Sequence, residues 1–171
     1  GGKNSSLGEM VQKLGKAGIK VPPGYATTAD AFRAFIRDNK LNEFIAERLA
    51  ELKDGKATLA DTGKTIRAAI AAGEWPKATG DAITAAYREL GKRTGSKEPS
   101  VAVRSSATAE DLPDASFAGQ QETFLNVRGE KALLDTCRRC YASLFTDRPI
   151  TYRTLKGFDK VVWEGETFAT E

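Results

Sequence analysis

Hydrophobic residues recur at intervals of three and four positions over most of the stretch from Thr28 to Gly95, which is the spacing of one buried helix face. They fall into successive groups: Phe32, Phe35 and Ile36; Leu41, Phe44, Ile45, Leu49 and Leu52; Ile66, Ala69 and Ile70; Ile83, Ala86, Tyr87 and Leu90. Residues that favour turns or helix ends separate the groups, at Asn39-Lys40, Asp54-Gly55, Gly73 and Pro76. The pattern predicts about four short helices whose apolar stripes form a core.

The amino-terminal segment carries a further helical pattern, with an apolar face made of Leu7, Met10, Val11 and Leu14. Ser6 and Glu9 have the spacing of a capping box, which predicts that this helix begins at Ser6. A glycine at position 15 or 18 can end it. Lys3 then lies beside the amino end of the helix, where free N–H groups and the helix dipole favour an anion. The alternative for Lys3 is an ordinary solvated lysine near a helix cap.

The periodicity changes after the break at residues 95–99. Val101 and Val103 alternate with smaller or polar residues, which predicts a strand that ends at Arg104. A polar loop from Ser105 to Gln121 leads to a second strand from Thr123 to Val127, and a long helix is expected from about Glu130 to Phe145. The predicted fold class is α+β, with helices dominating.

Arg104 is the most informative candidate for chemistry, because buried neighbours place it at the end of a strand. A guanidinium offers a fixed fork of donors that suits phosphate oxygens. The loop after it contains hydroxyls and small residues that expose backbone N–H groups: Ser105, Ser106, Thr108, Ser116 and Gly119. We interpret this loop as a flexible cover over a nucleotide, poorly ordered when no nucleotide is bound. Composition alone equally permits a long hairpin loop in which Arg104 pairs with Glu110, Asp111 or Asp114.

Other polar residues favour structural roles. Cys137 and Cys140 have the Cys-x-x-Cys spacing of some redox and zinc sites, but they share a helical face with Leu133, Leu134, Tyr141, Leu144 and Phe145. They are therefore expected to be small apolar core residues. Arg148 and Arg153 follow the long helix, where they are expected to cap its last carbonyl groups or reach an acidic partner.

Composition narrows the class of protein. A chain of 171 residues with 40% hydrophobic content fits one domain or a fragment of one. Its 26 basic and 23 acidic residues are interleaved and leave a net charge of +3, so neither nucleic acid nor a membrane surface is indicated as a partner. No cationic apolar leader or bilayer-length apolar run is present, and a cytoplasmic location is expected. The sequence contains no histidine for metal binding or proton transfer.

The segments from Val103 to Pro113 and from Ala115 to Val127 resemble the signature of the phosphoenolpyruvate synthase (pyruvate, water dikinase) family. Earlier in the chain, residues 1–10 and 21–28 resemble the opening of the same nucleotide-binding domain. The segment from Cys140 to Arg148, followed by Tyr152 and Arg153, resembles what comes after the loop in that family. These motifs occur in the order typical of the family.

The resemblance implies an ATP-grasp-type fold in which the nucleotide lies between two subdomains. Residues 1–160 would form the first, helix-rich subdomain in part, and residues 161–171 do not fit the family pattern. Lys3 and Arg104 match the family's phosphate-binding lysine and arginine, and Arg104 is the candidate catalytic residue. Gly119, Gln120 and Thr123 match the turn over the phosphate chain.

The same resemblance implies ATP and Mg²⁺ as cofactors, with the metal held largely by residues outside this chain. A family member passes a phosphoryl group from ATP to a histidine on a separate domain and then to pyruvate, giving phosphoenolpyruvate, AMP and phosphate. Because this chain has no histidine, its expected partners are a second ATP-grasp subdomain and a phosphohistidine domain, and alone it should not turn over. The alternatives are part of a rifampicin-type antibiotic phosphotransferase and a non-catalytic nucleotide-binding module.

Overall fold

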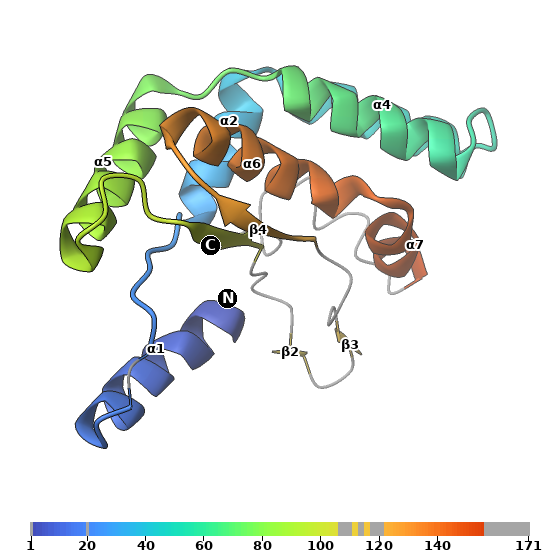
Figure 1. The fold of residues 1–171 in the computed structure, drawn as a ribbon. Helices are drawn as coiled ribbons and strands as arrows, with labels where there is room; N and C mark the ends of the chain where they lie inside the picture. The colour runs from blue at the N-terminus through green and yellow to red at the C-terminus, as the bar shows by residue number, and fades with distance from the viewer. Residues whose placement is uncertain (1, 20, 106–110, 113–114, 117–121, 156–171) are drawn as a thin grey trace.

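The computed structural model describes residues 2–19, 21–105, 111–112, 115–116 and 122–155 (Figure 1). The helices before the first strand are α1 Gly2–Lys16, α2 Ala29–Asp38, α3 Leu41–Lys53, α4 Leu59–Ala72 and α5 Lys77–Thr94. The strands are β1 Val101–Arg104, β2 Asp111–Leu112, β3 Ala115–Ser116 and β4 Thr123–Val127. After them come α6 Glu130–Ala142, the 3-10 turn η1 Ser143–Phe145, and α7 Asp147–Leu155. The class is α+β and helix-rich, as predicted.

Helices α2 to α5 confirm the four predicted helical groups and the breaks between them. Thr28 and Thr58 cap α2 and α4 because their hydroxyls accept hydrogen bonds from the N–H groups of Ala31 and Asp61, at 3.3 and 3.1 Å. Helix α5 ends at Gly95, whose φ of 68° is a left-handed conformation that glycine adopts without a steric penalty.

Helix α1 differs from the prediction at its start and in its packing. It begins at Gly2 rather than Ser6, so Ser6 lies inside the helix and does not mark its start. Lys3 therefore lies within the first turn instead of in a turn before the helix. Of the face expected to be buried, Met10 and Val11 are exposed by 39% and 51%, and Leu14 is half-buried.

Strands β1 and β4 form an antiparallel hairpin with a bulge. The paired residues are Val101 with Val127, Val103 with Phe124, and Arg104 with Thr123. Leu125 and Asn126 together lie opposite Ala102, and Asn126 has a φ of 57°. The bulge lets both Phe124 and Val127 pack into the core although they are three residues apart. Simple alternation along the sequence would have placed them on opposite faces.

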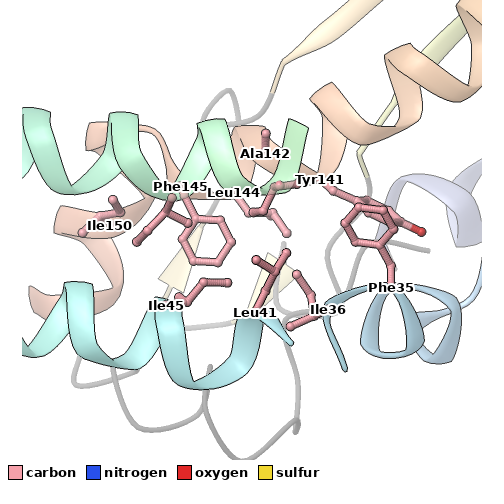
Figure 2. Packing of buried hydrophobic residues seen from close by; sticks show 11 residues of the cluster. Phe35, Ile36, Leu41, Ile45, Tyr141, Ala142, Leu144, Phe145 and Ile150 are labelled. Atoms are coloured by element: carbon pink, nitrogen blue, oxygen red, sulfur yellow. The ribbon is translucent and has the colours of Figure 1, made fainter. Parts of the chain in front are cut away.

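Two clusters form the core. The larger joins α2, α3 and α4 to the end of α6, η1 and α7 (Figure 2), and consists of Phe35, Ile36, Leu41, Ile45, Ile66, Ile70, Tyr141, Ala142, Leu144, Phe145 and Ile150. The smaller lies between α5, α6 and the β1–β4 hairpin, and contains Ile83, Tyr87, Val127 and Leu133. Trp75 packs against both clusters, and its indole N–H donates to the carbonyl oxygen of Leu134 at 3.2 Å.

The segment after α6 forms a helix where the sequence analysis expected none. Arg148 belongs to the first turn of α7, a helix that the sequence analysis did not predict. Proline is tolerated in the first turn of a helix, and Pro149 is fully buried there. The carbonyl oxygen of Phe145, at the end of η1, accepts a hydrogen bond from Nη1 of Arg67 on α4 at 2.7 Å. A side chain from α4 thus serves one carbonyl at this end of the long helical segment, and capping by Arg148 and Arg153 stays a prediction.

Among the described residues, no helix combines the length and the apolar character needed to cross a bilayer. The boundary expected at residue 160 and the segment 161–171 lie outside the described residues.

Candidate functional site

The end of the β1–β4 hairpin that leads into the connecting loop carries two of the predicted site residues. Arg104 is the last residue of β1, and its partner across the hairpin is Thr123, the first residue of β4. Side chains of directly opposed residues lie on the same face of a hairpin. Both residues are exposed, whereas the next pair, Val103 and Phe124, packs against the second core cluster. Arg104 and Thr123 therefore share the face of the hairpin that points away from the core.

The placement of Arg104 follows from the apolar residues before it. Val101 and Val103 pack against the second cluster, so β1 has one anchored face and its other face is solvated. Helix α6 contacts both strands from the anchored side, as Figure 1 shows. The guanidinium is thus presented at the end of a strand held by packing, as the sequence predicted.

Several of the arginines that the structure describes form ion pairs with carboxylates, for example Arg88 with Glu130 and Arg48 with Glu51, at 2.6 and 2.8 Å. Among the side chains that the structure describes, no carboxylate forms an ion pair with Arg104. The proposed pairing with Glu110 or Asp114 falls outside the described residues, and so does the side chain of Asp111. Within the described part, the charge of Arg104 is available to an anion.

The loop after Arg104 is described only in part. Ser105, the first residue of the loop, is buried, with 2% of its surface exposed. The short strands β2 and β3 pair antiparallel, Asp111 with Ser116 and Leu112 with Ala115, where the sequence predicted an irregular loop. The predicted cover at residues 106–110, 113–114 and 117–121, which includes Gly119 and Gln120, lies outside the described residues.

Lys3 is described by its backbone alone. In the view of Figure 1, the amino end of α1, which carries Lys3, is the end nearer the β1–β4 hairpin. The structure thus brings Arg104 and Thr123 together, and the convergence of the Lys3 side chain with them remains a prediction.

A further cation lies at the same end of β4, and the sequence analysis missed it. The guanidinium carbon of Arg139 on α6 is 4.4 Å from the centre of the Phe124 ring, within cation–π distance. Phe124 faces the core side of the hairpin, so Arg139 and Arg104 lie on opposite faces. Only the packing of α6 against β4 reveals this contact, because the two residues belong to different elements.

Metal binding by the described residues has no geometric basis, since no group of three or more His, Cys, Asp or Glu side chains gathers among them. Cys140 is buried and Cys137 packs against the second cluster, as predicted for apolar core residues, and both are free thiols. Burial raises the pKa of Cys137 to about 12, which keeps its thiol protonated.

Comparison with known proteins identifies the family of the chain. Residues 1–164 match the model of a protein family described as the pyruvate phosphate dikinase AMP/ATP-binding domain. The chain belongs to this family. The resemblance found in the sequence motifs is thereby confirmed.

Relatives of this dikinase-family chain are phosphoenolpyruvate synthases. The chain is 52% identical to the phosphoenolpyruvate synthase of Deinococcus radiodurans and 51% identical to that of Neisseria meningitidis, with 93% of this chain and 20% of either relative aligned. It is also 47% identical to a probable phosphoenolpyruvate synthase of Methanocaldococcus jannaschii, where 93% of this chain aligns with 13% of the relative. The chain thus spans about a fifth of the length of the first two relatives.

Proposed function

We propose that this chain is the ATP-binding part of a phosphoenolpyruvate synthase, and that Arg104 binds the phosphate chain of the nucleotide. The observation that carries the proposal is the β1–β4 hairpin, which presents an exposed Arg104 beside Thr123 in a member of an AMP/ATP-binding family. The phosphoenolpyruvate synthases among its relatives favour pyruvate over an antibiotic as the phosphate acceptor.

Each proposed residue has a defined task. The Arg104 guanidinium donates to phosphate oxygens and offsets the charge that shifts among them during phosphoryl transfer. The Thr123 hydroxyl, on the same face, supplies a further donor. Lys3, Gly119 and Gln120 complete the site in this proposal, with Lys3 as a point charge and the two others as the turn over the phosphate chain.

Mg²⁺ is part of the proposal as the ion that neutralises the phosphates of bound ATP. The described residues do not provide a ligand set for it, so we assign its protein ligands to other parts of the enzyme. In the proposed ATP-grasp arrangement, a second subdomain supplies them. A phosphohistidine domain then carries the phosphoryl group to pyruvate, and ATP and water yield AMP and phosphate.

Calorimetric titration of ATP with Mg²⁺ into the chain tests the binding site. Arg104→Ala removes a charge-assisted contact worth about 1.5–3 kcal/mol, so we expect affinity to fall about 10- to 150-fold. Arg37→Ala is the matched control, because Arg37 is an exposed arginine of α2 that pairs with Asp38 at 2.8 Å, away from the hairpin. An affinity that Arg104→Ala leaves unchanged would favour a non-catalytic fragment over the proposed site.

A chimera tests the proposed reaction. The aligned fifth of the Deinococcus radiodurans relative is replaced by this chain, and formation of AMP from ATP is measured with and without pyruvate. We expect pyruvate-dependent AMP formation that the chimera with Arg104→Ala largely loses, while the chain alone forms no AMP. A folded chimera that binds ATP without forming AMP would contradict the proposed function.

A further inference from the structure

The hydroxyl of Tyr87 links helix α5 to both strands of the β1–β4 hairpin at its base, the end opposite to Arg104. It donates a hydrogen bond to the carbonyl oxygen of Pro99 at 2.7 Å and accepts one from the N–H of Gly129 at 2.9 Å. Pro99 precedes β1 and Gly129 follows β4. One side-chain oxygen therefore holds the entry and the exit of the hairpin at the same point.

The surroundings make this bridge hard to replace. Tyr87 is 1% exposed and Pro99 is buried, so water does not reach the bridging oxygen freely. A buried carbonyl or N–H group that loses its partner is destabilised by its lost solvation. Phenylalanine would keep the ring packing against Val127 and Leu133 but leave both backbone groups without this partner.

The hairpin depends on such attachments for its orientation. A two-stranded hairpin is at best marginally stable by itself in water. Beside the base, Arg88 of α5 also pairs with Glu130, the first residue of α6, through two hydrogen bonds of 2.6 and 2.8 Å. Arg104 lies about 16 Å along the chain from Pro99 at ~3.3 Å per residue, so a small rotation at the base moves the guanidinium appreciably.

We propose that Tyr87 is a positioning residue of the nucleotide site, whose hydroxyl fixes the base of the hairpin and thereby the place of Arg104 and Thr123. The inference rests on the proposed role of Arg104 in binding ATP. It adds a residue of α5 that does not touch the ligand and acts through the hairpin alone.

A double-mutant cycle tests the inference by measuring the dissociation constant of ATP with Mg²⁺ for wild type, Tyr87→Phe, Arg104→Ala and the double variant. We expect Tyr87→Phe to weaken binding about three- to tenfold when Arg104 is present. In the Arg104→Ala background the same change should alter binding less than about twofold, because its effect passes through Arg104. A general loss of structure would instead weaken binding in both backgrounds.

Tyr25→Phe is the matched control, since the Tyr25 hydroxyl also donates to a carbonyl of α5, that of Ile83, at 3.2 Å. It should leave ATP affinity unchanged.

If Tyr87→Phe does not fold, the cycle is run in the chimera, where the KM for ATP should rise while the KM for pyruvate stays constant. Equal weakening in both backgrounds, or none, would overturn the inference. An Arg104→Ala variant that binds ATP normally would instead overturn the proposed function on which it rests.

Discussion

At the scale of single residues, burial decides which polar groups of this protein are reactive. Cys137 packs against the second core cluster and Cys140 has 4% of its surface exposed. The thiolate is the form of cysteine that attacks alkylating reagents, and burial raises the pKa of Cys137 to about 12. Neither thiol is therefore poised for chemistry in the folded chain.

The reaction of the native chain with iodoacetamide at pH 8 tests this description. We expect modification of Cys137 to be slower than in urea-unfolded chain by on the order of a hundredfold or more, because the unfolded thiol returns to its ordinary pKa. Mass spectrometry of samples quenched over time gives both rates. Similar rates in the two states would show that the thiol is accessible and ionised.

The sequence allowed some residue roles to be predicted and hid others. The placement of Arg104 at the end of a strand was predictable because strand alternation requires only neighbouring residues. Tyr87 was correctly assigned to a core stripe, but its hydroxyl meets Pro99 and Gly129, and the latter contact needs the folded hairpin. A tyrosine at a position that packs like phenylalanine is the one signal available, since a buried hydroxyl usually has a partner.

At the scale of elements, close approach between α4 and η1 depends on a glycine. A Cβ atom placed on Gly63 would lie 2.9 Å from the carbonyl oxygen of Phe145 and 2.7 Å from Nη1 of Arg67. The same carbonyl accepts the hydrogen bond from Arg67, so the glycine and the arginine together fix how α4 meets η1.

We expect Gly63→Ala to lower the free energy of unfolding by about 1–3 kcal/mol, because the added methyl group must push a backbone carbonyl away. Gly8→Ala is the control, since Gly8 is an exposed residue of α1 with open space around it. There alanine should leave stability unchanged or raise it by up to about 1 kcal/mol through its higher helix propensity. Urea unfolding followed by circular dichroism measures both variants, and equal losses would contradict the packing described.

Element boundaries show where sequence patterns lose their predictive power. The predicted boundaries of α2 to α5 agree with the structure because turn residues and caps mark them locally. The start of α1, the helix α7 and the bulge at Asn126 were missed. Helix α7 holds Ile150 in the larger cluster and the bulge turns Phe124 and Val127 to one side, so tertiary packing decides both.

At the scale of the whole molecule, two core clusters that share Trp75 support one exposed hairpin end. The α+β class and the dikinase family were predictable from periodicity and motifs, and both are confirmed. The convergence of the Lys3 side chain with Arg104 stays a prediction, because Lys3 is described by its backbone alone. The nucleotide cover and the domain boundary at residue 160 stay predictions.

The central claim is that Lys3 and Arg104, which lie far apart in the sequence, bind the phosphate chain of one nucleotide. Titrating ATP, ADP and AMP with Mg²⁺ into wild type, Lys3→Ala and Arg104→Ala measures it most directly. Each substitution should weaken the binding of ATP by about tenfold or more and the binding of AMP by much less, since only contacts to the outer phosphates are lost. Substitutions that leave ATP affinity intact, or weaken ATP and AMP equally, would contradict the claim.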